Sequence, residues 1–192
     1  MLEKIKKLRE ATGAGIVEVK KALEESGGNE EKAREILRKR GQEKAAKKIG
    51  RVASEGVVAS YIHSNQKVGA IVKLLCETDF VALNEEFKAL ATDIAMHITA
   101  MNPAYLRPED VPEEIIAKER EIWTAQMENE KKPKEILEKI LAGKEKKFRE
   151  ETALLTQPFI KNPDQKISDL LAEKIGKIGE NIQIGEFSRL EL

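Results

Sequence analysis

The chain has 192 residues, 41% of them hydrophobic, and its 34 basic side chains balance its 34 acidic ones. This composition supports one folded core, or a core with a small additional module, and argues against a disordered chain. The apolar runs are far shorter than the roughly 20 residues that a membrane-spanning helix needs, and the charged N-terminus lacks the features of a secretory signal. A single cysteine excludes an internal disulfide, so the expected compartment is the cytoplasm.

Three short amphipathic helices are predicted within residues 1–41, where apolar residues repeat at helical spacing. Gly13 and the Gly27–Gly28 pair predict the ends of the first two helices. Asn29 predicts the cap of the third helix and Gly41 its end. The core of such a module is very small, so we expect it to be marginally stable alone and to offer apolar surface to a partner.

Residues 42–53 are expected to form a charged helical connector. Residues 1–51 hold 15 basic and 9 acidic side chains, and the excess of positive charge is concentrated in residues 38–51. Such a run is usually a solvated helix face, and the neutral total argues against a nucleic-acid partner. RNA binding by residues 38–51 stays open as an alternative, which a steep salt dependence of binding would support.

An antiparallel strand pair opens the remaining region, residues 54–192. Alternating and apolar residues predict strands over 57–62 and 68–76, joined by a turn at Asn65–Gln66. The second strand is apolar on nearly both faces, so it needs cover on both sides. A helix capped by Asn84 can supply one cover.

Prolines predict where later helices begin, because proline suits the first position of a helix. Helices are expected to start near Pro112 and Pro133, and the second is expected to stop at Gly143. A last helix is expected after residues 162–164, and residues 181–192 predict a closing strand. The order of elements predicts an α+β fold, with a helical module followed by an antiparallel sheet packed with helices.

The most informative stretch is residues 74–82, in which a long apolar strand runs into Thr78, Asp79 and Phe80. This corner lies between two elements of regular structure, where a recognition residue can be held in place. A Phe at the end of a strand more often fills a core, and the residues alone leave both interpretations open.

Other candidate residues have simpler explanations. Ile16 and Val17 are adjacent and point about 100° apart on a helix, so one of them is expected to be exposed. A scattered surface aliphatic residue usually has no function. Trp123 and Phe148 lie in charged helical segments and are expected to pack within the fold.

Catalytic and metal sites find little support. Cys76, His63 and Asp79 could form a nucleophilic triad near one end of the hairpin, but a thiol among leucines is a weak nucleophile. One cysteine and two well-separated histidines, His63 and His97, do not predict a metal site. The chain has no glycine-rich loop of the kind that binds nucleotide phosphates. We therefore predict no cofactor and no metal.

Two segments closely resemble the signatures of the elongation factor Ts family. Residues 10–23 read EATGAGIVEVKKAL, and residues 76–82 read CETDFVA. Residues 45–48, 154–159 and 181–184 are also similar to that family, so the resemblance covers essentially the whole chain.

The resemblance implies a ubiquitin-associated-like domain over residues 1–41, the connector over 42–53 and a core dimerisation domain over 54–192. It also implies a guanine-nucleotide exchange factor that binds elongation factor Tu, both GDP-bound and nucleotide-free, and promotes GDP release during translation elongation. Such a factor makes and breaks no covalent bond, so it is not an enzyme. The chain looks like the short variety with one core copy, which implies a homodimer and a two-to-two complex.

The resemblance also implies where the partner binds. The corner Asp79 and Phe80 would enter the GTPase near its magnesium and phosphate site, while the N-terminal helices would contact its nucleotide-binding domain. Family members more often have methionine at the positions of Ile16 and Val17, and both residues here remain apolar. The implied partner-binding residues are Arg9, Ile16, Val17, Lys20, Thr78, Asp79, Phe80 and Val81. Binding of a ubiquitin-like or peptide partner by the three-helix module stays open as an alternative.

Overall fold

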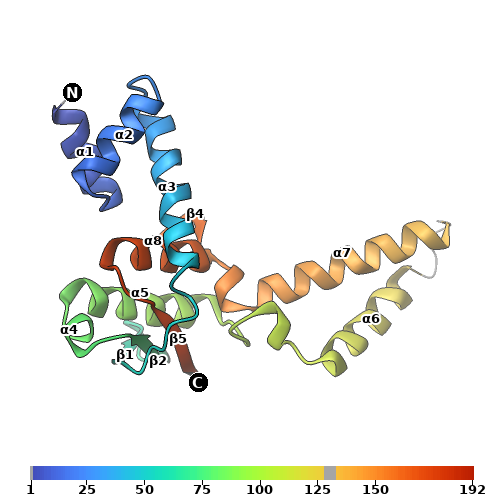
Figure 1. The fold of residues 1–192 in the computed structure, drawn as a ribbon. Helices are drawn as coiled ribbons and strands as arrows, with labels where there is room; N and C mark the ends of the chain where they lie inside the picture. Colours follow the sequence, from blue (N-terminus) through green and yellow to red (C-terminus); the bar gives the residue numbers. More distant parts are fainter. Residues whose placement is uncertain (1, 128–132) are drawn as a thin grey trace. The chain divides into compact units, whose positions relative to one another are not determined.

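The computed structural model of the protein describes residues 2–127 and 133–192 (Figure 1). The chain forms two compact units, the first made of Met1–Met96 with Ser168–Leu192 and the second of His97–Ile167. Helices combine with two antiparallel sheets, which confirms the predicted α+β fold. The predicted domain boundaries, at residues 41 and 53, stay a prediction.

The first unit begins with three helices packed around a small core (Figure 1). These helices are α1 (Leu2–Thr12), α2 (Ile16–Glu25) and α3 (Glu30–Ala46). Their buried core residues are Leu8, Val19, Ala22, Leu23, Ala33 and Leu37. Gly13, Gly27 and Gly28 all have positive φ, so the predicted ends of α1 and α2 are confirmed. Asn29 Oδ1 accepts hydrogen bonds from two backbone N–H groups of the first turn of α3, which confirms the predicted cap.

The third helix is longer than the sequence indicated. α3 continues through Gly41 to Ala46, so the predicted end at Gly41 is wrong, and residues 47–50 form turns instead of a helical connector. Contacts with α8 (Ile167–Ile178) explain the extension. A Cβ atom added to Gly176 of α8 would lie 3.5 Å from the backbone of Gly41, so the two helices approach closely at this glycine pair. This packing outweighs the roughly 1 kcal/mol that a helical glycine costs relative to alanine.

The first unit also contains an antiparallel sheet of three strands. Its strands are β1 (Glu55–Ile62), β2 (Val68–Cys76) and β5 (Gln183–Glu191), with β2 in the middle. β1 pairs with β2 from Glu55 opposite Cys76 to Ile62 opposite Gly69. The predicted strand pair and closing strand are therefore confirmed.

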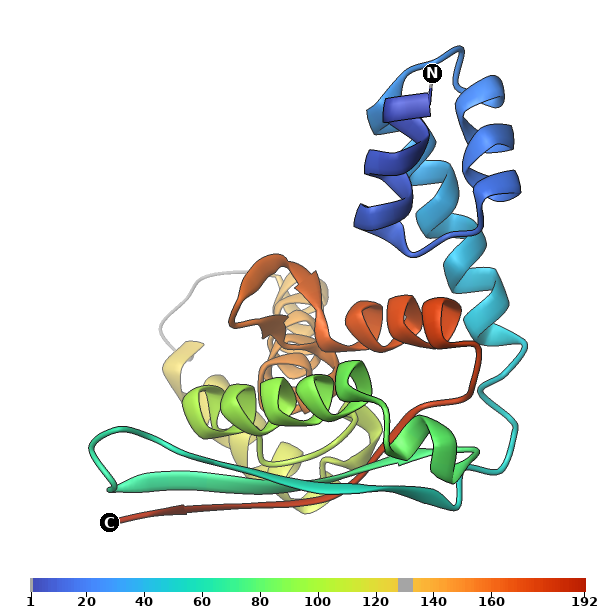
Figure 2. The same cartoon turned by 90° about the vertical axis from the view of Figure 1, so that its left-hand side faces the viewer.

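One face of this sheet is covered by a helix. Figure 2 shows α5 (Glu85–Met101) lying along the sheet. Asn84 Oδ1 accepts a hydrogen bond from the Glu86 N–H at 2.7 Å, which confirms the predicted cap. On the covered face Val72 and Leu74 of β2 are at most 1% exposed, and Phe87 of α5 is fully buried. The opposite face carries exposed apolar side chains, namely Val58, Ile62, Ile71 and Leu190.

The second unit contains a pair of long helices. After the end of α5 it holds a 3₁₀ turn (η1, Pro108–Asp110), α6 (Glu113–Met127), α7 (Lys134–Thr152) and a second 3₁₀ turn (η2, Leu154–Thr156). Pro112 and Pro133 immediately precede α6 and α7, so the predicted starts are confirmed. The centroids of the Trp123 and Phe148 rings lie 6.0 Å apart in an edge-to-face arrangement, which confirms that these residues pack within the fold.

Two predicted boundaries in this region are wrong. α7 runs through Gly143 to Thr152, because Phe148 and Arg149 beyond the glycine make contacts with α6 that continue the helix. Residues 162–164 do not lead directly into a helix. They belong to β4 (Asn162–Lys166), which pairs with β3 (Pro158–Phe159), and the last helix begins only at Ile167.

A buried histidine ties α5 to this hairpin within the second unit. His97 is fully buried, and its Nδ1 accepts a hydrogen bond from the Ile160 N–H at 3.2 Å. Its Nε2 therefore carries the proton and donates to Gln157 Oε1 at 3.0 Å. Burial lowers the pKa of His97 below the ordinary histidine value of about 6.5, because the charged ring would be desolvated.

This arrangement predicts acid sensitivity. The unfolded chain binds a proton at His97 more readily than the folded chain, so the stability is present above the ordinary pKa and is lost as the pH falls below it. As the pH falls from about 6.5 toward the lower pKa of His97 in the folded chain, the free energy of unfolding should fall by up to about 1.4 kcal/mol per pH unit, measured by urea unfolding with circular dichroism. His97→Gln should remove this dependence, and the exposed His63→Gln should retain it. An unchanged dependence in His97→Gln would contradict the prediction.

Candidate functional site

The corner after β2 presents an exposed aromatic ring. Phe80 is 82% exposed, and Leu83 beside it is 67% exposed. Phe80 lies in α4 (Asp79–Ala82), a single helical turn, and Leu83 directly follows it. The turn buries Ala82 and leaves the side chains of Phe80 and Leu83 exposed. Phe80 is therefore not a core residue of this chain, which excludes the simpler of the two interpretations.

The other corner residues are held by short-range hydrogen bonds. Asp79 is exposed, and its Oδ1 accepts from the Phe80 N–H at 2.9 Å. Thr78 and Val81 are half-buried, and the Thr78 carbonyl accepts from the Cys76 thiol at 3.2 Å. Burial raises the pKa of the Cys76 thiol to about 11, so at neutral pH it is a protonated donor and not a nucleophile.

Two residues that the sequence analysis did not select also hold this corner. Glu180 Oε2 accepts from the N–H groups of Glu77 and Thr78, at 3.1 and 3.0 Å. Its Oε1 accepts from the Thr78 hydroxyl at 2.6 Å. Asn181 N–H donates to Glu77 Oε1 at 2.7 Å. These contacts join positions separated by 102 to 104 residues, so no local pattern in the sequence could have indicated them.

The three-helix module carries the other predicted site residues on its surface. Ile16 is 55% exposed and Val17 is 67% exposed, so both are accessible where only one was expected. Arg9 and Lys20 are also exposed, and Lys20 forms an ion pair with Glu24 at 3.9 Å.

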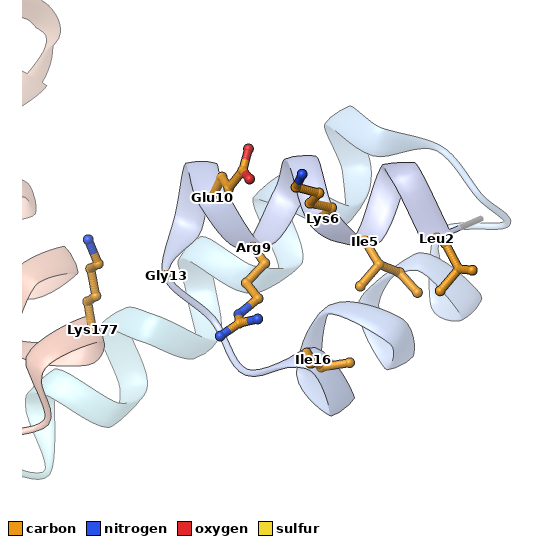
Figure 3. A pocket seen from close by; sticks show the side chains of 8 residues that line it. All are labelled: Leu2, Ile5, Lys6, Arg9, Glu10, Gly13, Ile16 and Lys177. Carbon is orange, nitrogen blue, oxygen red and sulfur yellow. The ribbon is translucent and has the colours of Figure 1, made fainter.

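A groove lies beside these residues. Figure 3 shows Leu2, Ile5 and Arg9 extending from α1 toward α2, where Ile16 lies. The groove has a volume of about 580 Å³. Its lining residues are Leu2, Ile5, Lys6, Arg9, Glu10, Gly13, Ile16 and Lys177. The lining thus combines aliphatic side chains with three cations and one carboxylate. Of the predicted residues, the structure thus brings Arg9 and Ile16 together here, and Thr78 to Val81 at the corner.

The nucleophilic triad is wrong. His63 directly follows β1, whose last residue pairs with Gly69, whereas Cys76 lies opposite Glu55 at the other end of the strand pair. A strand of this length separates the two ends by roughly 23 Å. Among the described residues, no group of three or more His, Cys, Asp and Glu side chains is arranged to hold a metal ion. Within the same residues, no helix has the length and apolar character needed to cross a membrane.

The basic run at residues 38–51 is partly neutralised by contacts within the first unit. Arg40 forms an ion pair with Glu25 at 2.7 Å, and Lys44 forms one with Glu18. Lys48 donates to a backbone carbonyl. Arg40 and Lys44 already have acidic partners and so offer less to phosphate groups, which weakens the RNA alternative.

Comparisons with known proteins agree with the two signature segments. The family model described as Elongation factor TS matches residues 2–192. A protein named Elongation factor Ts from Carboxydothermus hydrogenoformans is 57% identical over 188 residues, which are 98% of this chain and 87% of that protein. One of the same name from Thermodesulfovibrio yellowstonii is 54% identical over 98% of this chain and 94% of its own length. The chain therefore belongs to the elongation factor Ts family and has the role of a translation elongation factor.

Proposed function

We propose that the chain binds elongation factor Tu in the cytoplasm and promotes the release of GDP, with Phe80 acting as an apolar wedge near the magnesium and phosphate site. The observation that carries the proposal is the 82% exposure of Phe80 on a corner held by hydrogen bonds. Leaving this ring in water forgoes roughly 1.5–3 kcal/mol of burial, so its position stabilises a complex and not the free chain. Nucleotide release makes and breaks no covalent bond, so this activity is not enzymatic.

The energetics of exchange set what the corner must do. A nucleotide bound with nanomolar affinity is held by about 12 kcal/mol, with its phosphates and magnesium ion among the main contacts. If the factor weakens GDP binding, linkage requires that GDP weakens binding of the factor by the same ratio. An apolar ring from Phe80 can separate elements around the phosphates, and the exposed Asp79 carboxylate adds negative charge beside the metal ion. Thr78 and Val81 flank this pair and complete the contact surface.

Replacing the ring tests the wedge. Phe80→Ala should lower the maximum rate of GDP release by about 10-fold or more, because an aromatic contact of about 2 kcal/mol made in the exchange state is lost. The concentration of factor that gives half-maximal release should change less. Stopped-flow fluorescence of a labelled GDP leaving elongation factor Tu measures both quantities.

Ile122→Ala is the matched control, because Ile122 is 50% exposed on α6 and lies outside the proposed site. It should leave the maximum rate unchanged. Equal losses of rate and of affinity in Phe80→Ala would contradict a wedge, since they would indicate that the ring only anchors the complex.

The three-helix module is proposed to supply anchoring affinity. Its groove combines apolar side chains with exposed cations, and Ile16, Val17, Arg9 and Lys20 are all accessible. None of the four belongs to the buried core of the module. Contact with the nucleotide-binding domain of elongation factor Tu would cover this surface.

Alanine substitutions separate anchoring from folding. Ile16→Ala and Val17→Ala should raise the half-maximal concentration for GDP release and change the free energy of unfolding by less than about 0.5 kcal/mol, because both side chains are exposed. Leu8→Ala is the contrasting variant: Leu8 is 1% exposed, and its truncation should cost about 2–5 kcal/mol. Urea unfolding by circular dichroism measures stability. If Ile16→Ala or Val17→Ala failed to fold, the substituted residue would belong to the core and not to the anchoring surface.

We further propose that two chains pair through the uncovered face of the sheet, giving a two-to-two complex with elongation factor Tu. Val58, Ile62 and Leu190 are 73%, 69% and 78% exposed on that face, and Ile71 is 51% exposed at its centre. Ser60 and Ser188 lie opposite Ile71, and Lys73 lies opposite Val58, so the face mixes exposed apolar side chains with polar ones. Exposed apolar side chains gathered on one sheet face are typical of an interface, because sheets pack face to face about 10 Å apart. A self-complementary contact of this kind closes as a two-fold dimer.

A charge at the centre of this face tests the pairing. The native chain should sediment at about twice its mass of 21.6 kDa, and Ile71→Lys should sediment as a monomer, because a buried lysine without a partner is strongly unfavourable. Analytical ultracentrifugation measures both. Ile122→Lys, at a similarly exposed isoleucine on α6, should remain dimeric. A native chain that is monomeric at micromolar concentration would contradict the proposal.

A further inference from the structure

β2 and β5 separate just before the Phe80 corner. Their last paired residues are Leu75 and Gln183, and the pairing of β2 with β1 ends at Cys76, so the N–H groups of Glu77 and Thr78 lie beyond the sheet. Buried or half-buried backbone N–H groups need acceptors from elsewhere. Here the acceptor is one side chain, the carboxylate of Glu180, in the loop between α8 and β5.

Glu180 supplies three of these hydrogen bonds with a single carboxylate. One oxygen accepts from the backbone N–H groups of Glu77 and Thr78, and the other accepts from the Thr78 hydroxyl. All three are part-buried. Bonds to an ionised acceptor are roughly twice as strong as neutral ones, so this carboxylate fixes the two residues that precede Asp79 and Phe80.

The two segments hydrogen-bond to each other in both directions. The Glu77 carboxylate accepts from the Asn181 N–H, so residues 77–78 and 180–181 hold each other by side-chain to backbone bonds in both directions. Asn181 is 1% exposed, and its Nδ2 donates to the Arg51 carbonyl at 2.7 Å and to the Ile49 carbonyl at 3.3 Å. The loop that holds the corner therefore also contacts the backbone that follows α3.

The conformation of the loop directs Glu180 toward the corner. Gly179 has φ +92°, which residues with a side chain rarely adopt, and it reverses the chain between α8 and Glu180. The Lys48 ammonium group donates to the Gly179 carbonyl. The loop is thus held on both sides of Glu180, by Lys48 before it and by the bonds of Asn181 after it.

We propose that Glu180 is a positioning residue for Phe80, with Asn181 completing the connection; this rests on the proposed function of Phe80 as a wedge. On this proposal Glu180 acts through the backbone of the corner and not through contact with the partner. It holds the backbone of Glu77 and Thr78 in the one conformation from which the next turn projects the ring outward.

Two substitutions at one position test this role. Glu180→Ala removes all three acceptor contacts and should lower the maximum rate of GDP release from elongation factor Tu by about 10- to 100-fold, because a ring displaced by about 1 Å loses its productive contacts. The half-maximal concentration should change by less than about threefold, since the anchoring surface is intact. Glu180→Gln keeps one oxygen for both N–H groups and should stay within about threefold of the native rate.

The glutamine variant separates positioning from charge. If Glu180 acted on the partner through its negative charge, Gln and Ala would slow release equally, and that result would overturn the proposal. Glu138→Ala is the matched control: its carboxylate accepts a hydrogen bond from Arg120 at 2.6 Å within the second unit, and neither residue belongs to the proposed partner surface. It should release GDP at the native rate.

A measurement on the free chain keeps the two proposals distinguishable. Measured by NMR, the backbone amides of Glu77 and Thr78 should exchange with deuterium about 10-fold faster or more in Glu180→Ala, and by a clearly smaller factor in Glu180→Gln, whose amide oxygen still accepts from both N–H groups. Thr78→Val removes only the hydroxyl contact with Glu180 and should give amide exchange rates between those of the native chain and Glu180→Ala. This variant replaces Glu180→Ala in the test if Glu180→Ala does not fold. A native chain without effect on GDP release would refute the proposed function, whereas amides equally protected in Glu180→Ala would refute the positioning role.

Discussion

The exposed ring of Phe80 depends on the hydrogen bonds that replace the sheet where β2 and β5 part. A corner with unsatisfied backbone donors would take up other conformations, and Phe80 would then be free to fold back onto apolar neighbours. Glu180 and Glu77 exchange carboxylate-to-backbone bonds across this gap, and Asn181 extends the network to the carbonyl of Arg51. The ring is exposed because the polar groups beneath it are satisfied.

Three exposed apolar features share one physical explanation. The free chain leaves the Phe80 ring, the Ile16 and Val17 side chains, and one face of the sheet in contact with water. Each forgoes burial energy that a self-sufficient fold would use. Under the proposed function, a partner or a second copy that covers these surfaces recovers this energy. The small core of the three-helix module fits the same pattern, because a module of this size is stabilised by the surfaces that it joins.

Helix ends, strands and caps were predictable from short-range signals. Gly13, Asn29 and Asn84 end or cap helices through their own conformational preferences, and the alternation of β1 and the apolar run of β2 are visible in the sequence. The two signature segments were sufficient to indicate the family. Gly41 and Gly143 misled the prediction, because contacts of α3 with α8 and of α7 with α6 continue each helix through its glycine.

The candidate site divides in the same way. The sequence placed Asp79 and Phe80 at a corner and Ile16 and Val17 on a helix, since both statements follow from neighbouring residues. It left open whether Phe80 was buried, and it contained no sign of Glu180, because hydrogen bonds across 102 residues arise only when α8 brings its loop to the end of β2. Local preference follows from a few adjacent side chains, whereas exposure and long-range hydrogen bonding depend on which distant segments the folded core places together.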